Sequence, residues 1–487
     1  MKITPPSRYR KRPFAILYPG KRMMGVDSEM GRQVFEGRRN VEKALFALSD
    51  HVLFVHTSLE PLKHTTGALS WKMTAWKGRQ TGMIHIPSGA RVSSLRQTLI
   101  ESATPYDDLA RVMNWVSDYG VTPGSISGMA WNLFRSSLSS EVTISCDADL
   151  GRAAFYGGRQ QITTPKKYQG MIAADITAAY PFAMASRDYA LSLREVSKTT
   201  NIDPEEPGIA IATVAIPSSL PYGPLPIRID QETIQFPYGV VQGAWTWCEL
   251  DAAKQLGCEV TVEQAFAPRR RADLFFSWWQ MGMTGRKLEG DSRNMAKAIL
   301  NSTWGQFAMN GDDRSEVSWS DDAGQTMIEV QLDKRNLPHQ WTAHIAAETT
   351  SRVRRRMLLE GLYGPTKPPV HVDTDGIIIS ATSPMPVDTG DEVGQWRKKT
   401  NIAELDLRAP QLYRYVCGPA CGHEHPKWHY VASGMNQLVA EHYFENHKHL
   451  KTTVAFFGEP DRVLPREYSG DLDAIERWSR EARSLTA

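Results

Sequence analysis

One stretch of the sequence, residues 369–380, constrains the fold more than any other. Two carboxylates, Asp373 and Asp375, interrupt a strand pattern that is otherwise rich in Val and Ile. The period of two in a strand places both side chains on one face, and Asp375 followed by Gly376 is typical of a hairpin turn. Because burying a carboxylate among apolar side chains is costly without a partner charge, the pattern favours a site for a hard cation such as Mg2+. An ordinary acidic turn is the alternative.

A second acid stands in a matching setting. Asp175 ends an apolar strand that starts near Met171, and a helix-like run follows it at residues 182–185. A two-metal site needs carboxylates delivered by separate parts of the chain. The pattern therefore predicts a two-metal site for Mg2+, or alternatively Mn2+, at which Asp175 is joined by Asp373 and Asp375.

Composition and charge narrow the class of protein. A chain of 487 residues can form two to four domains. It is 41% apolar and 23% charged with a net charge of +2, so the overall charge does not indicate a nucleic-acid partner. Basic residues gather at positions 9–12, 269–271, 352–356 and 397–399. Each cluster alone could be a solvated face, but several of them beside an acidic site favour a phosphate-backbone partner.

The same sequence indicates the compartment. Its five cysteines do not form the dense framework of a disulfide-rich protein. Apolar runs fall short of the roughly 20 residues that span a bilayer, and the N-terminus lacks the apolar core of a signal peptide. We expect a cytoplasmic protein that makes no use of a membrane.

Helical spacing recurs along the chain. It occurs at residues 107–116, 245–257, 272–279, 293–302 and 346–362, and a polar, turn-rich hairpin is expected at 309–342. In the helix at 293–302, Arg293, Lys297 and Asn301 share one face. That face is either the solvent-exposed side of an amphipathic helix or a triphosphate-binding surface, since cationic side chains on a helix can bind phosphate oxygens.

Three motifs follow one another in order. They are Asp-x-x-x-x-Tyr-Pro from Asp175, Lys-x-x-x-Asn-Ser-x-Trp-Gly from Lys297, and His-x-Asp-Thr-Asp-Gly from His371. Together they resemble the first palm motif, the fingers motif and the second palm motif of family B DNA polymerases. The departures are Trp304 in the place of a Tyr, and His371 and Gly376 in the places of the Tyr and Ser that flank the second palm motif.

Weaker likenesses extend the match to roughly residues 105–440. The run from Phe155 through Gly158 resembles the Tyr-x-Gly-Gly element before the palm, with Phe155 for the Tyr, and residues 430–435 resemble a thumb sequence. Gln411 stands where the family has the Lys of Lys-x-Tyr, which puts that lysine contact in doubt. The chain is most similar to the protein-primed branch of phages and linear plasmids, because 309–342 occupies the place of its second insertion.

The resemblance implies an α+β fold, a right-hand polymerase whose antiparallel palm sheet carries fingers and thumb. A reduced exonuclease-like α/β domain would precede it. The implied domains are a reduced exonuclease-like domain at 1–152, palm with the first insertion at 153–265, fingers at 266–308, palm with the hairpin insertion at 309–408, and thumb with the C-terminal tail at 409–487.

The resemblance also implies roles for individual residues. Lys297 would neutralise the triphosphate, Tyr180 would exclude a 2′-hydroxyl, and Asn301 and Trp304 would line the nascent base pair. Further implied contacts are Arg293, Arg286 and Lys287 to the nucleotide, and Tyr156, Gly157, Gly158 and Tyr413 to DNA.

The implied activity is template-directed addition of dNTPs to a primer 3′-hydroxyl by two-metal phosphoryl transfer. Primed template DNA and dNTPs would be the partners of a monomer, and a separate terminal protein is a candidate primer. A primer-independent primase-polymerase on the same palm is the alternative. A nuclease would not need the Lys297 helix, and a silent DNA-binding protein would tolerate loss of the acids.

Proofreading is expected to be absent. Asp27 and Glu29 match the first motif of the family's exonuclease and Asp108 the third, but the middle motif is not in register near residues 54–60. A site that lacks one carboxylate would bind its metals poorly. Substitution by Glu60 is the alternative.

A cluster of Cys and His residues near the C-terminus is a candidate zinc site. Its proposed ligands are Cys417, Cys421, His423 and His425. Zn2+ ligands often group in this way, whereas a reduced loop with exposed histidines is the alternative.

Overall fold

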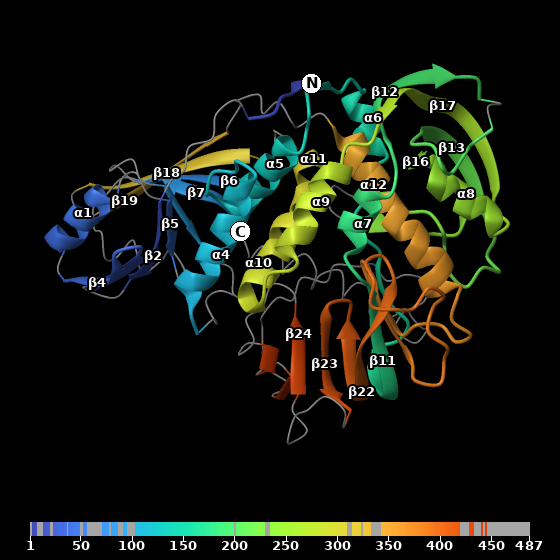
Figure 1. Ribbon diagram of the computed structural model, residues 1–487. Helices are drawn as coiled ribbons and strands as arrows, with labels where there is room; N and C mark the ends of the chain where they lie inside the picture. The colour runs from blue at the N-terminus through green and yellow to red at the C-terminus, as the bar shows by residue number, and fades with distance from the viewer. Residues whose placement is uncertain are drawn as a thin grey trace. The chain divides into compact units, whose positions relative to one another are not determined.

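The computed structural model describes residues 2–6, 13–19, 23–36, 38–48, 52–55, 71–76, 79–85, 91–94, 103–198, 201–228, 234–308, 314–322, 325–332, 342–418, 428–432, 440–441 and 444–445 (Figure 1). Two compact units make up the chain. The first unit is Met1–Ser145 with Asp273–Ala343, and the second unit is Cys146–Ala272 with His344–Ala487. The division into five domains stays a prediction.

The second unit is built around an antiparallel sheet of seven strands. Their order is β10 (Gln160–Ile162), β20 (His371–Asp373), β21 (Gly376–Ser380), β11 (Lys166–Ile176), β22 (Trp396–Ala409), β23 (Leu412–Cys417) and β24 (Trp428–Ala432). Figure 1 shows β11, β22, β23 and β24 side by side. A buried apolar cluster that includes Met171, Ile378 and Leu405 holds these strands together. This is the antiparallel palm sheet that the sequence predicted.

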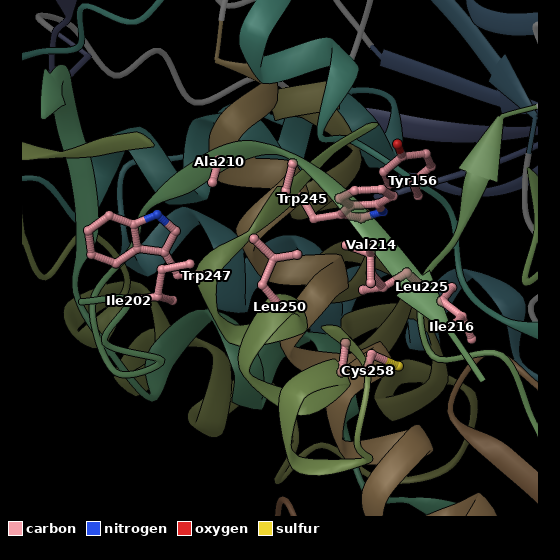
Figure 2. Close-up of a cluster of buried hydrophobic side chains, with 12 residues drawn as sticks. Tyr156, Ile202, Ala210, Val214, Ile216, Leu225, Trp245, Trp247, Leu250 and Cys258 are labelled. Carbon is pink, nitrogen blue, oxygen red and sulfur yellow. The ribbon is translucent and has the colours of Figure 1, made fainter. Parts of the chain in front are cut away.

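A second sheet in this unit has four strands. Their order is β12 (Tyr189–Val196), β17 (Glu259–Ala272), β13 (Ile209–Ile216) and β16 (Gly239–Thr246). A separate two-stranded pair is β14 (Ile227–Arg228) with β15 (Ile234–Gln235). Alternate residues of β13 are buried, as the period of two requires. They pack with Trp245 of β16 and Leu250 of α8 (Trp247–Gln255) in the apolar core of Figure 2.

Besides α8, the described helices of the second unit are α6 (Ala148–Ala153), α7 (Ala179–Ala185) and α12 (Ala343–Arg356). Helix α12 continues as a π-helix, η2 (Met357–Leu362). The sequence predicted one regular helix at 346–362, but the last turns widen. A π-helical turn is rare and marks an interrupted hydrogen-bond ladder. Here η2 packs on β21, and Gly361 lets Trp396 approach its backbone, since a Cβ would lie 3.1 Å from the indole.

The basic cluster at 352–356 is not an open phosphate-binding surface. Arg352 is buried against Glu348, with Nε 3.0 Å from Oε1, and Arg354 is buried against Glu249 at 2.8 Å. Buried guanidinium groups need such partners because their desolvation is costly. These arginines therefore tie α12 into the second unit, and the interpretation of this cluster as a DNA contact was wrong.

The first unit contains a mixed sheet of nine strands. Their order is β19 (Gln325–Leu332), β18 (Arg314–Asp322), β6 (Trp71–Trp76), β7 (Arg79–His85), β8 (Arg91–Ser94), β5 (Val52–Val55), β2 (Phe14–Pro19), β3 (Met23–Ser28) and β4 (Gly31–Glu36). The β2–β5 and β5–β8 pairs are parallel. The hairpin expected at 309–342 forms as β18 and β19, and β18 pairs with β6 of the N-terminal segment.

The remaining elements of the first unit are mostly helical. They are α1 (Arg38–Ala47), α4 (Pro105–Asp118), α5 (Ile126–Ser136), α9 (Phe276–Gly285), α10 (Gly290–Asn301), α11 (Thr303–Ala308) and the strand pair β1 (Lys2–Ile3) with β9 (Val142–Thr143). Helix α9 begins later than predicted because β17 runs through Ala272 and the Asp273 carboxylate then accepts the N–H groups of Phe275 and Phe276. Within the described residues, none of the helices is long and apolar enough to cross a membrane.

Candidate active site

The acidic stretch of the sequence forms a tight turn between β20 and β21. Asp373 pairs with Gly376, so Thr374 and Asp375 make the turn. Thr374 has φ 59°, and the Asp375 N–H donates to the Asp373 carbonyl at 2.6 Å. This is the strained, positive-φ form of the γ-turn. The prediction that strand periodicity places both carboxylates on one face was therefore wrong, because Asp375 lies in the turn and not in a strand.

Hydrogen bonds from two other segments hold this turn in place. The Thr374 N–H donates to the Arg159 carbonyl at 2.7 Å, and the Ile176 N–H donates to the Asp375 carbonyl at 2.9 Å. Strain of this kind persists only where the surroundings fix it, and it gathers at functional sites. The turn is thus clamped from the end of β11 and from the segment before β10.

The sheet register brings Asp175 to the same turn. Gly376 is paired with Asp373 on one side and with Asp175 on the other. A Cβ on Gly376 would lie 3.8 Å from the Asp175 Cβ. Asp175 and Asp373 therefore flank Gly376 from the two neighbouring strands, and Asp375 precedes it in the chain, although Asp175 is far away in the sequence.

Two cations lie beside Asp175. Lys399 Nζ is 3.1 Å from Oδ2, and Arg397 Nη2 is 3.6 Å from Oδ1. Arg397 and Lys399 alternate along β22, which is the signal that could have placed both on the face of Asp175. The sequence had assigned them only to a basic cluster, so the structure adds their specific partner.

The chemistry of Asp175 fits a metal ion. Its Oδ1 is buried, and among the described residues it has no hydrogen-bond donor. A buried carboxylate oxygen without a donor is costly, whereas Mg2+ prefers such oxygens. Asp175, with the neighbouring Asp375, can therefore supply the oxygens that the metal needs.

Asp373 is held by neutral donors. Its Oδ1 accepts hydrogen bonds from Gln160 Nε2, Gln411 Nε2 and Thr374 Oγ1, each at 3.1 Å. The sequence did not indicate either glutamine as a partner of Asp373, because β10 and the β22–β23 loop come close to Asp373 only in the folded sheet. Burial lowers the pKa of the neighbouring His371 to about 4, so its ring is neutral at pH 7.

The segment at residues 155–158 packs against the turn through Gly158. A Cβ on Gly158 would lie 2.8 Å from Thr374 Cγ2, whereas Gly157 has nothing within 4 Å of such a position. Arg354 donates to the carbonyls of Tyr156 and Gly157. Gly158 is therefore required for close packing beneath the turn.

The ring of Tyr156 is buried, so the predicted DNA contact at this residue would have to come from its backbone and stays a prediction. Figure 2 shows this ring beside Trp245, and it is only 4% exposed. Burial raises the pKa of Tyr156 to about 12. Tyr413 is half-buried, with its ring 4.9 Å from that of His371, and its DNA contact stays a prediction.

Tyr180 lies in the first turn of α7, next to the acids. Ala178, at φ 52°, turns the chain sharply between β11 and α7. Burial raises the pKa of Tyr180 above its ordinary value, and the charge of Asp375 raises it further. The ring is 9% exposed. The structure thus brings Tyr180 to the carboxylate site.

The predicted triphosphate residues lie in the first unit. On α10, Arg293, Lys297 and Asn301 are exposed, while Met295 and Ile299 are buried. The shared polar face is confirmed, and its role stays a prediction. Three further predicted nucleotide contacts lie near this helix in the sequence. Arg286 is the C-cap residue of α9, Lys287 is exposed, and Trp304 is half-buried in α11.

The assignment of Asp108 to the third exonuclease motif stays a prediction. The Asp108 carboxylate accepts from Ser292 Oγ at 2.7 Å and from Arg111 Nη2 at 2.5 Å. Burial raises the pKa of Tyr106, and the charges of Glu29, Asp27 and Asp107 raise it further. Glu60 lies outside the described residues.

Only one of the four proposed zinc ligands, Cys417, is among the described residues, and it does not support a zinc site. Cys417 is disulfide-bonded, and a thiol in a disulfide is not the thiolate that Zn2+ binds. The other proposed ligands, Cys421, His423 and His425, lie outside the described residues. Across the part of the chain that is described, three or more His, Cys, Asp or Glu side chains do not gather as a metal-ligand group.

Comparison with known proteins shows which proteins the chain is similar to. Residues 122–351 match the sequence model of DNA polymerase type B, organellar and viral, and no curated protein matches the chain. The fold is similar to phi29 DNA polymerase complexed with primer-template DNA and incoming nucleotide substrates, with TM-score 0.66, 12% identity and coverage of 89% of this chain and 94% of that one. The fold is also similar to phi29 DNA polymerase complexed with single-stranded DNA, with TM-score 0.63, 12% identity and coverage of 88% of this chain and 94% of that one.

These findings confirm the two main predictions from the sequence. At identities this low the phi29 likeness shows a shared fold. Residues 122–351 match the type B DNA polymerases, and the chain has the fold of the phi29 enzyme.

Proposed function

We propose that this protein adds dNTPs to a primer 3′-hydroxyl under the direction of a template, with Asp175 and Asp375 as the metal-binding residues. The observation that carries the proposal is the sheet register, which places Asp175 and Asp373 on the two sides of Gly376, directly after Asp375 in the chain. Bound Mg2+ ions would activate the 3′-hydroxyl and stabilise the leaving pyrophosphate. Asp373, fixed by its amide donors, supports the site without being one of the two proposed ligands.

The protein's cations would manage the remaining charge. Lys399 and Arg397 balance Asp175 in the structure, and they become available to phosphate oxygens once a metal takes the carboxylate. From the first unit, the exposed face of α10 offers Lys297 and Arg293 to the triphosphate, with Arg286 and Lys287 as further contacts. Positive groups aimed at a transferring phosphoryl group stabilise its transition state.

The proposed DNA substrate is a primed template. The two phi29 structures are complexes with primer-template DNA and nucleotides, or with single-stranded DNA. Asn301 and Trp304 would contact the nascent base pair, while the backbone of residues 157–158 and Tyr413 would contact the DNA strands. A separate terminal protein would supply the primer in the cell.

One assay separates this function from its alternative. Purified protein is given dNTPs and Mg2+ with a primed template or with the same template unprimed. We expect extension only of the primed template. Synthesis on both at similar rates would instead favour a primer-independent primase-polymerase, and synthesis on neither would contradict both proposals.

Tyr180 is predicted to select the sugar of the nucleotide. Tyr180→Val should admit ribonucleotides, because the ring beside Asp375 is placed to clash with a 2′-hydroxyl. The discrimination ratio, kcat/KM for dNTP over rNTP, should fall at least tenfold. Tyr189→Phe is the matched control: this buried tyrosine bonds Thr349 in α12, so the ratio should not change. An unchanged ratio in Tyr180→Val would make Tyr180 a packing residue only.

Proofreading is predicted to be absent. The middle exonuclease motif is missing from the sequence, and Asp108 is already engaged by Arg111 and Ser292. A primer with a mismatched 3′ end, incubated with Mg2+ and without dNTPs, should keep its length under conditions that support extension. Rapid shortening that Asp27→Ala abolishes and Asp375→Ala does not would overturn this prediction.

A further inference from the structure

A strained glutamine stands at the loop between β22 and β23. Ala409 pairs with Leu412, so Pro410 and Gln411 alone make the turn, and Gln411 has φ 56°. Proline fixes its own φ near −65°, and a proline followed by positive φ is the pattern of a type II turn, which favours Gly or Asn at the second position. Glutamine has a Cβ and rarely adopts this conformation. Its presence here calls for a compensating interaction.

The side chain of Gln411 supplies that interaction. Its Nε2 donates to Asp373 Oδ1 at 3.1 Å, and Gln160, which is paired with Asp373 across β10 and β20, donates to the same oxygen at 3.1 Å. An ionised carboxylate only accepts hydrogen bonds, so both amides present their nitrogen. One amide from the β22–β23 loop and one from β10 thus donate to the same oxygen of Asp373.

Asp373 accepts hydrogen bonds from neutral donors, whereas the neighbouring Asp175 faces cations. Asp175 is balanced by Lys399 and Arg397, whereas Asp373 has amides and the Thr374 hydroxyl. The amides and the hydroxyl therefore fix the orientation of Asp373 beside Asp175 and Asp375 without placing a cation there.

We propose that Gln411 and Gln160 are positioning residues for nucleotide addition, which hold Asp373 in a fixed orientation beside the metal-binding acids. Gln411 occupies a strained backbone position because this amide is needed there. The inference rests on the proposed function of Asp175 and Asp375. It adds two residues to that site, neither of which touches the reacting groups.

Gln411→Gly tests the proposal because stability and function should move in opposite directions. Glycine accepts positive φ without strain, so the thermal unfolding temperature should stay equal or rise. The kcat for single-nucleotide addition should fall roughly tenfold, the low end for loss of a hydrogen-bond partner around a metal site. The KM for dNTP should change much less than kcat. Mn2+ binding, titrated by electron paramagnetic resonance without substrate, should weaken.

Asp388→Gly is the matched control. Asp388 is an exposed residue of the second unit with φ 59°, so the change relieves similar strain away from Asp373 and should leave kcat and Mn2+ binding unchanged. Gln160→Leu should lower kcat as Gln411→Gly does, and the double variant should lose less than the product of the two losses, because both act through one carboxylate.

Two results would overturn the inference. One is wild-type kcat and Mn2+ binding in Gln411→Gly; the other is a kcat loss accompanied by a lower unfolding temperature, which would make Gln411 a structural tie. The Mn2+ titration does not require turnover. An inactive wild type would therefore count against the proposed function, while weaker Mn2+ binding by Gln411→Gly would still support the positioning role.

Discussion

Asp175→Ala and Asp375→Ala should each abolish nucleotide addition while binding of primed template is retained. Each change removes carboxylate oxygens from the edge where Asp175 and the Asp375 turn meet. A metal at such a site stabilises the transition state by several kcal/mol, so the rate should fall by roughly a thousandfold or more. Single-turnover addition of one dNTP measures the rate, and fluorescence anisotropy with labelled primer-template measures binding.

Binding should survive for an electrostatic reason. Removing Asp175 leaves Lys399 and Arg397 without their anion, so positive charge near the DNA phosphates increases. Asp391→Ala, at an exposed acid of the same unit, is the control and should keep the wild-type rate. Extension by either alanine variant at more than a few per cent of that rate would show that the metal site has been misassigned.

Gly158→Ala should nearly inactivate the protein, although it adds only a methyl group. The new Cβ would lie 2.8 Å from Thr374 Cγ2 and 3.1 Å from Thr374 Cβ. Thr374 cannot move freely, because its N–H is bound to Arg159 and its φ is 59°. The turn that carries Asp375 must therefore shift, and misplacement by about 1 Å can lower a rate roughly a hundredfold.

Gly157→Ala is the matched control, since a Cβ there meets nothing within 4 Å. It should keep most of the wild-type rate and stability, whereas Gly158→Ala should also lose about 1–3 kcal/mol of unfolding free energy through overpacking. Urea denaturation and the primer-extension rate are measured for both. Equal losses of rate in the two variants, with DNA binding weakened in both, would favour a shared DNA contact over packing beneath the turn.

The parts of the site that follow from local pattern could be predicted from the sequence. Apolar runs ending in acids gave the strands of Asp175 and Asp373, and the amphipathic pattern gave the exposed face of α10. The turn was placed one residue late because Asp375 and Gly376 match a common turn dipeptide. In the structure Thr374 takes the positive φ instead, held there by the Arg159 carbonyl.

Contacts between distant segments could not be predicted in the same way. Which residues reach Asp373 depends on the register of β10 against β20 and on a two-residue loop. The arginines of α12 looked like a DNA surface because charge patterning does not show burial; Arg354 meets Glu249, more than a hundred positions away. Tyr156 looked like a DNA contact because its motif resembles one, yet its ring completes the core around Trp245.

The most direct test of the central claim is single-nucleotide addition to a primed template, with each of the four dNTPs supplied alone in the presence of Mg2+. The account predicts addition only of the dNTP complementary to the template base, no addition when the divalent metal is removed by a chelator, and no addition by Asp375→Ala. Failure to extend with any dNTP, equal addition of all four, or full activity without a divalent metal would contradict it.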